Sequence, residues 1–158
     1  MENIFIGKII SNFKEQNLLC EEMAAYANEQ LELLKTSDKA QATARVMEVM
    51  VKRQKLLEDL QVLDAENKHL QEQVLSQLNI SEFILSSLKP KLEAAQYDKL
   101  KQVVNSLGVI LGTISEIDNE NQLLMRANLG VKNKGKKASN QQASNMYKQV
   151  RDLDKKFE

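Results

Sequence analysis

Apolar residues recur along most of the chain at alternating steps of three and four, a spacing that places side chains on one stripe of a helix. The pattern predicts one helix over residues 3–35 and a second over residues 38–78. The first stripe consists of Ile6, Ile10, Phe13, Asn17, Cys20, Ala24, Ala27, Leu31 and Leu34. The second consists of Val46, Val49, Arg53, Leu56, Leu60, Leu63, Asn67, Leu70, Val74 and Gln77. Thr36, Ser37 or Asp38 is expected to cap the second helix, because each side chain carries an oxygen that accepts hydrogen bonds from unpaired N–H groups.

A second interruption, over residues 79–81, separates these helices from the rest of the chain. A short helix is expected around Ser81, Phe83, Ile84, Leu85 and Leu88, before Pro90. Since proline disfavours helix at the residue before it and suits a first turn, a third long helix should begin near Pro90 and reach about residue 129. Its stripe is the most regular and consists of Leu100, Val103, Leu107, Ile110, Ile114, Ile117, Asn121, Leu124 and Asn128.

The composition changes from Gly130 onward, where the run VKNKGKKAS is basic and has little apolar surface. Residues 132–158 hold eight of the 22 basic and three of the 22 acidic residues, so their net charge is +5 and that of the preceding chain is −5. Met146, Val150, Leu153 and Phe157 then predict a short amphipathic helix. The chain therefore divides into a helical domain, residues 1–130, and a flexible basic tail, residues 131–158.

The composition supports an all-α fold. Among 158 residues there are five Gly, one Pro and no Trp, too few turn formers for a protein made of sheets. A helix over residues 38–78 would be about 60 Å long at 1.5 Å per residue. The expected architecture is an elongated, coiled-coil-like antiparallel bundle of three long helices.

The single cysteine and the absence of long apolar runs indicate a protein of the reducing cytoplasm. Cys20 lies in an apolar stripe, which predicts a buried, reduced thiol without a disulfide partner. The first ten residues include Glu2 and no basic region typical of a secretory signal. No apolar run approaches the ~20 residues that span a bilayer.

No group of residues has the spacing of a catalytic, cofactor or metal site. His69 lies beside the second stripe, and Glu66 with His69 is the nearest approach to a carboxylate–histidine metal pair. No glycine-rich phosphate loop occurs. The basic tail lacks the interleaved aromatic residues that stack on bases, so a solvated linker is favoured over a nucleic-acid site. We therefore expect neither enzymatic activity nor a cofactor.

Several residues depart from the apolar pattern inside the stripes. Asn17, Asn67, Asn121 and Asn128 occupy apolar positions, where a buried amide either fixes helix register or marks a stripe left open for a partner helix. Gly108 and Gly112, four residues apart, permit close approach of another helix.

The run ISEIDNENQLLMRANL, residues 114–129, resembles the FlgN family of flagellar export chaperones. That family places two Asn three residues apart and then a Leu pair near the end of its last long helix. Asn121, Leu123 and Leu124 match this pattern, and Asp118 stands where the first Asn is usual. The layout of the two preceding helices is also similar, so that the resemblance covers roughly residues 5–130.

The resemblance implies a cytoplasmic chaperone that binds the C-terminal helical segments of the two hook–filament junction proteins. Such chaperones prevent premature association of these clients and deliver them to the cytoplasmic domain of the flagellar type III export gate. A tyrosine beyond the last long helix docks on that gate, and Tyr147 corresponds to it by position. No nucleic acid, membrane insertion or cofactor is implied.

An amphipathic client helix could lie on the stripe of the third long helix with anchors at i, i+3, i+4 and i+7. The residues expected to bind it are Leu107, Ile114, Ile117, Asn121 and Leu124. Continuous heptads also suit a self-associating coiled-coil scaffold without a client. The scaffold should form a stable oligomer, whereas the chaperone should be a monomer or a weak homodimer.

Overall fold

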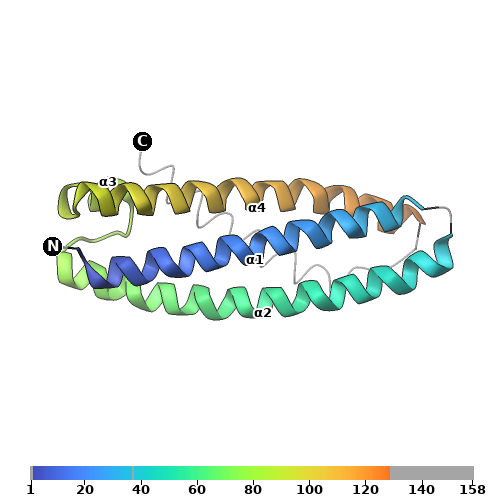
Figure 1. The fold of residues 1–158 in the computed structure, drawn as a ribbon, viewed down its shortest axis with the longest axis horizontal. Coiled ribbons are helices and arrows are strands. Elements are labelled where there is room, and N and C mark those ends of the chain that lie inside the picture. The colour runs from blue at the N-terminus through green and yellow to red at the C-terminus, as the bar shows by residue number, and fades with distance from the viewer. Residues whose placement is uncertain (1, 37, 129–158) are drawn as a thin grey trace.

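A computed structural model describes residues 2–36 and 38–128 (Figure 1). Within them the chain forms α1 (Ile4–Leu34), α2 (Lys39–Leu78), α3 (Leu85–Leu88), a 3-10 turn η1 (Lys89–Lys91) and α4 (Ala94–Asn128). These described residues contain no strand, which confirms the predicted all-α class for this part of the chain. The proposed boundary at residue 130, the tail helix and Tyr147 lie outside them.

The first two long helices begin and end close to the predicted positions because specific side chains close their termini. The Asn3 side-chain oxygen accepts a hydrogen bond from the Ile6 N–H at 3.1 Å. Of the three candidate caps for α2, Asp38 accepts from the Gln41 N–H at 3.2 Å. α2 ends at Asn79, whose φ of 55° lies in the left-handed region that Asn tolerates better than most residues.

The segment around Pro90 differs from the prediction. The short helix begins at Leu85, so that Phe83 and Ile84 precede it, and the last long helix begins at Ala94 and not at Pro90. Pro90 belongs instead to the turn η1, which ends where Leu92 takes an extended backbone conformation with φ −114° and ψ 155°. This extended residue prevents η1 from continuing directly into α4.

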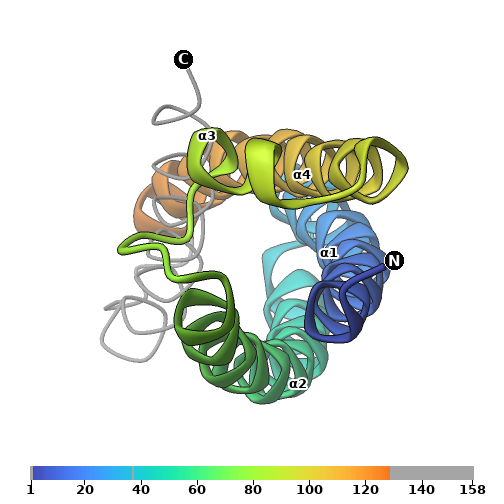
Figure 2. The same ribbon diagram turned by 90° about the vertical axis from the view of Figure 1, so that its left-hand side faces the viewer.

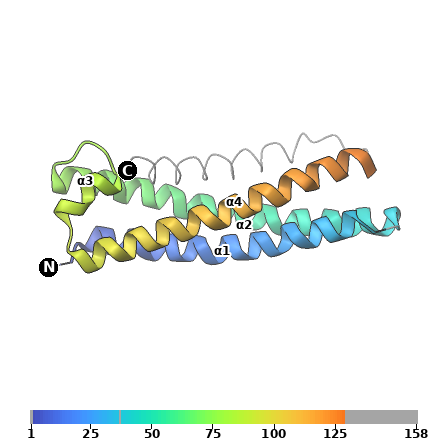
Figure 3. The ribbon, with the colours of Figure 1, turned by 90° about the horizontal axis from the view of Figure 1, so that it is seen from above.

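The helix α1 lies between the other two long helices (Figure 2). It packs closely against both α2 and α4, whereas the backbones of α2 and α4 make far fewer close approaches to each other. α2 runs antiparallel to α1, and α4 runs parallel to it (Figure 1). α4 also crosses α1 obliquely (Figure 3). The described helices are therefore paired mainly through α1, and the backbones of α2 and α4 approach each other less closely.

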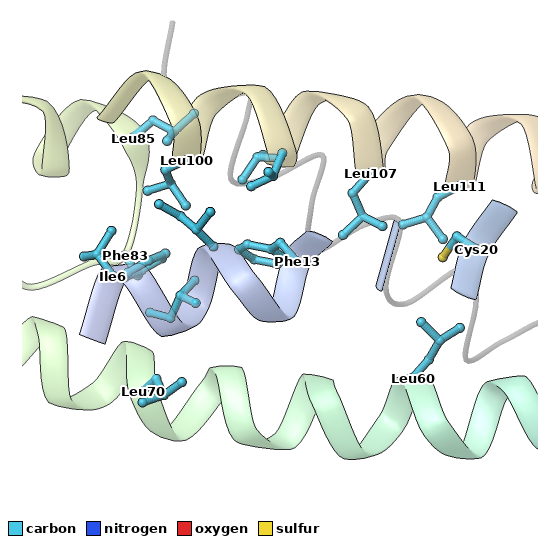
Figure 4. Packing of buried hydrophobic residues seen from close by; sticks show 14 of the residues in the cluster. Ile6, Phe13, Cys20, Leu60, Leu70, Phe83, Leu85, Leu100, Leu107 and Leu111 are labelled. Atoms are coloured by element: carbon cyan, nitrogen blue, oxygen red, sulfur yellow. The ribbon is translucent and has the colours of Figure 1, made fainter. Parts of the chain in front are cut away.

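The hydrophobic core follows the seam where the three long helices meet. Its larger cluster runs along most of the seam, and a smaller one consists of Leu33, Leu34, Val46, Val49 and Met125 near the α1–α2 turn. In the larger cluster, Leu107 and Leu111 of α4 point towards Cys20 of α1 and Leu60 of α2 (Figure 4). Most residues of the predicted stripes lie in the core, together with residues outside the stripes such as Leu57 and Leu111.

Candidate partner-binding surface

The five residues predicted to bind a client divide into two groups. Leu107, Ile114 and Asn121 are buried, with exposed fractions of 1%, 2% and 0%. Ile117 and Leu124 are half-buried and thus reach the surface of the described helices. The structure brings all five onto α4, but a partner can touch only the last two without separating the helices.

Asn121 joins α4 to α1 through its side-chain amide. Its Nδ2 group donates to the backbone carbonyl of Ala27 at 3.0 Å and to the Asp118 carboxylate at 3.3 Å. The Asn121 carboxamide oxygen is buried and accepts no hydrogen bond from the described residues. Because sliding α4 along α1 would break the bond to Ala27, Asn121 fixes the register of these two helices.

Beside Asn121, a buried ion pair connects α4 to α2. The Arg53 guanidinium donates to both oxygens of the Asp118 carboxylate, at 2.8 Å and 2.5 Å. The two side chains are 10% and 8% exposed. This two-pronged geometry is the strongest that an arginine and a carboxylate can adopt. Arg53 and Asp118 therefore hold together two helices whose backbones are poorly packed against each other.

The remaining donors of Arg53 are directed at α1. The Arg53 Nη1 group, which also bonds Asp118, donates to the Gln30 side-chain oxygen at 2.9 Å. The Arg53 Nε group donates to the Met23 sulfur at 3.1 Å. Gln30 is fully buried and donates in turn to the Met125 sulfur at 3.4 Å. A single polar network, consisting of Gln30, Arg53, Asp118 and Asn121, thus spans all three long helices.

The other stripe asparagines also bond between helices. Asn17 donates to the Val103 carbonyl of α4 at 3.2 Å, and Asn67 accepts from Asn12 of α1 at 3.0 Å. Both bonds support the register interpretation of these residues. The side chain of Asn128 lies outside those that the structure describes.

The Asn17 bond also establishes which side of α4 carries the half-buried apolar residues. Val103 lies on the flank of α4 beside α1, because Asn17 bonds its carbonyl. Ile110, Ile117 and Leu124 follow Val103 at intervals of seven, so they continue this flank. The accessible part of the predicted site is therefore a row of apolar side chains along the edge where α4 meets α1.

The chemistry of the described side chains is that of packing and hydrogen bonding. Within residues 2–36 and 38–128, no group of three His, Cys, Asp or Glu side chains could hold a metal ion. His69 is exposed, and its Nε2 atom lies 3.2 Å from the Gln73 side-chain nitrogen one turn further along α2. Burial raises the pKa of the Cys20 thiol to about 12, so this thiol is protonated at neutral pH. None of the described helices has the length and apolarity needed to cross a membrane.

Comparison with known proteins identifies the family. The family model for FlgN protein matches residues 1–151. The chain belongs to the FlgN family. FlgN proteins are flagellar export chaperones, which agrees with the resemblance of residues 114–129. Neither the curated proteins nor the solved structures gave a match.

For this FlgN chain, the run that carries the family resemblance includes both structural and accessible residues. Asp118 and Asn121 are turned into the helix junction, while Ile117 and Leu124 reach its edge and Leu123 is 66% exposed. The sequence analysis missed the ion pair of Asp118, although its partner Arg53 stands at an apolar position of the second stripe. The basic residue Arg53 inside the second stripe is the signal that a buried acidic partner exists. Asp118 lies beside the third stripe and not in it, so the spacing alone did not mark it as that partner.

Proposed function

We propose that this chain is a cytoplasmic FlgN chaperone that binds the C-terminal helices of the hook–filament junction proteins. It prevents their premature association and delivers them to the flagellar type III export gate. The observation that carries the proposal is the row of half-buried apolar residues on α4, of which Ile117 and Leu124 lie inside the run that resembles the family.

The row has the spacing that an amphipathic client helix needs. Ile117 and Leu124 are seven residues apart, two turns of helix, and therefore lie one above the other on the edge of α4. Half-buried apolar side chains on a firmly held helix give a partner apolar contact area with little ordering cost. A client helix can lie along this edge with its own apolar stripe against Ile117 and Leu124.

The three buried residues of the predicted site have roles inside the helix bundle. Leu107 and Ile114 hold α4 against the core, which keeps the row straight. Asn121 has a buried oxygen with acceptor capacity that the described residues do not use. A client that inserts a polar donor between α1 and α4 would bond this oxygen, which would select one register of the client helix. Tyr147, in the tail, is the proposed docking residue for the export gate.

The client site can be tested with single substitutions on α4. Purified chain carrying Ile117→Asp or Leu124→Asp is titrated with a junction protein, and calorimetry measures the dissociation constant. We expect each variant to weaken binding at least tenfold, because a charge at an apolar anchor costs more than about 1.4 kcal/mol. Val109→Asp is the matched control, since Val109 is also an apolar residue of α4 but is 72% exposed and lies off the row.

The interpretation of the titration depends on folding and on the client segment. Circular dichroism at 222 nm should show the same helix content in all three variants. Binding should also be lost when the C-terminal helical segment of the client is removed. Unchanged affinity of folded Ile117→Asp and Leu124→Asp chains would show that the client binds elsewhere.

A self-associating scaffold is the second candidate, and exposed apolar residues on α2 favour it. Met47, Val51 and Val62 are 53%, 70% and 68% exposed, and their spacing places them along one side of the helix. Sedimentation distinguishes the two functions. The chaperone should sediment as a monomer or weak dimer, whereas a scaffold should sediment as a stable oligomer at low micromolar concentration.

A further inference from the structure

The edge where α4 meets α1 is acidic along the row formed by Ile110, Ile117 and Leu124. Residues 102–125 of α4 include three acidic residues and no Lys or Arg. Residues 15–34 of α1, which packs closely against α4, include five acidic residues and no Lys or Arg. The two helices that border the row therefore surround it with negative charge.

On the α1 side of the row, the acidic residues are Glu21 and Glu32. Asn17 faces α4, since its amide donates to the Val103 carbonyl at 3.2 Å. Glu21 and Glu32 follow Asn17 by 4 and 15 residues, close to whole turns of helix, so they continue the side of α1 that Asn17 occupies. Both glutamates are exposed, and the Glu32 carboxylate lies 4.0 Å from the exposed Lys35 Nζ atom. Glu21 forms no ion pair with another described residue.

On the α4 side of the row, the acidic residue is Glu120. Asn121, the next residue, is turned inward, since its amide donates to the Ala27 carbonyl of α1 at 3.0 Å. Glu120 is turned about 100° from Asn121, beyond Ile117 and Leu124, and is exposed. Among the described residues it has no ion-pair partner. The row therefore has an accessible carboxylate on each side.

We propose that the partner helix that binds this edge carries Lys or Arg on both sides of its apolar stripe. The inference rests on the proposed function and adds to it the chemistry of the partner. The apolar stripe of the partner lies on Ile117 and Leu124. Its basic residues lie towards Glu21 on one side and towards Glu120 on the other. Opposite charges at the rim of an interface speed association and exclude helices of the wrong charge, whose like charges would face each other.

A buried atom of Asn121 has the same chemical requirement as the carboxylates. Asn121 is 0% exposed, and its amide nitrogen is used by α1 and by Asp118. Its carboxamide oxygen accepts no hydrogen bond from the described residues. This oxygen needs a donor, as the carboxylates of Glu21 and Glu120 do. Lys and Arg side chains are donors without acceptor capacity, so a basic partner helix matches this edge.

Two synthetic amphipathic helices test the charge requirement on the full chain. They share one apolar stripe and differ only in the residues beside it, which are Lys in one helix and Glu in the other. Fluorescence anisotropy measures the dissociation constant of each. We expect the Lys helix to bind at least about tenfold more tightly at about 0.1 M salt and the difference to shrink at about 1 M, where exposed charges are screened. Ile117→Ser, which removes apolar contact without adding charge, should weaken binding of the Lys helix.

Charge reversal beside the row tests the named glutamates. Glu21→Lys with Glu120→Lys reverses one charge on each side, and we expect it to weaken the Lys helix at least about fivefold at about 0.1 M salt and to strengthen the Glu helix. Glu15→Lys with Glu22→Lys is the matched control, since it changes the net charge equally. Glu22 lies one turn before Tyr26, whose ring faces α2, and Glu15 lies two turns before Glu22. The control should change either affinity less than about twofold.

Several outcomes would overturn the inference. Equal affinity for the two helices, tighter binding of the Glu helix, or no binding of either would reject a basic partner for this edge. Equal losses in the two charge-reversed chains would show that only the net charge of the protein acts. Circular dichroism at 222 nm checks that the variants fold. If Glu21→Lys with Glu120→Lys does not fold, Glu21→Gln with Glu120→Gln replaces it and should weaken the Lys helix in the same direction, whereas an unchanged affinity would reject the role of both glutamates.

The synthetic helices make failure of this inference distinguishable from failure of the proposed function. If a junction protein binds at Ile117 and Leu124 while the Lys and Glu helices bind equally, the client site stands and the charge requirement is wrong. If the chain prefers the Lys helix at the row but binds no junction protein, the charge requirement stands and the proposed client is wrong.

Discussion

The ion pair between Arg53 and Asp118 gives the sharpest prediction for stability. Replacing Asp118 by Ala leaves the Arg53 guanidinium, only 10% exposed, with the Gln30 oxygen and the Met23 sulfur as neutral neighbours. Breaking a buried pair from one side costs about 3–5 kcal/mol, because the remaining charge stays desolvated. We expect Asp118→Ala to lower the free energy of unfolding by that amount.

Removing both charges should cost much less. In the double variant Arg53→Met with Asp118→Leu, apolar side chains of comparable length fill the junction and no buried charge is left unpaired. Exchanges of this kind are often neutral or stabilising. We expect the double variant to lie within about 1 kcal/mol of the original chain. A double-mutant cycle completed with the single variants Arg53→Met and Asp118→Leu should therefore give a coupling energy of at least about 2 kcal/mol.

Urea unfolding followed by circular dichroism at 222 nm measures these differences at equal m-values. Asp64→Ala is the matched control on α2. Asp64 pairs with Lys68 at 3.3 Å, but the two side chains are 28% and 56% exposed. Loss of such a helical surface pair should cost no more than about 0.5 kcal/mol. If Asp118→Ala were as mild as this control, the junction would be hydrated and the network would not hold α2 to α4.

Three further changes probe single residues. Replacing Asn121 by Ala should cost about 0.5–1.5 kcal/mol in urea unfolding, since the hydrogen bond between α4 and the Ala27 carbonyl of α1 is lost. Asn79→Val should destabilise by about 1–2 kcal/mol, whereas Asn79→Gly should be neutral or better, because φ is 55° there and valine resists the left-handed region. For Cys20, the folded thiol has its pKa raised to about 12 from 9.0. The unfolded chain therefore releases the thiol proton first, and the stabilising contribution, complete below pH 9, should fall by about 1.4 kcal/mol per pH unit above it. Cys20→Ala should show a flatter decline from pH 9 to pH 11; parallel curves would contradict the assigned burial.

The long helices could be predicted from the sequence because their signals are local. Heptad spacing identifies the buried stripe, and the caps at Asn3 and Asp38 are read within one turn of helix. The start of α4 could not be predicted in this way. Pro90 is compatible with a first α-helical turn, and the choice of a 3-10 turn with an extended Leu92 depends on how the chain passes from α3 into α4.

The pairing of the helices required information that heptads do not contain. A regular stripe allows α4 to pack on α1, on α2 or between them. In the structure, hydrogen bonds join α4 to α1 through Asn17 and Asn121, and to α2 through Asp118. Each bond needs a partner more than 60 residues away, which single-sequence spacing cannot supply. The same limitation explains why the predicted client residues included three that the helices bury.

The polar network explains why α4 packs in one alignment against its neighbours. Its apolar stripe alone would allow several alignments with similar apolar contacts. Leucine and isoleucine recur at every turn of this stripe, so sliding α4 by one heptad would preserve most apolar contacts. Such a shift would instead separate Asp118 from Arg53 and Asn121 from Ala27, which leaves a buried charge unpaired and breaks the bond that joins α4 to α1. That penalty favours one alignment of α4. The alignment in turn determines that Ile117 and Leu124 stand at the α1 edge. The position of the proposed client surface is therefore a consequence of the buried polar residues beside it.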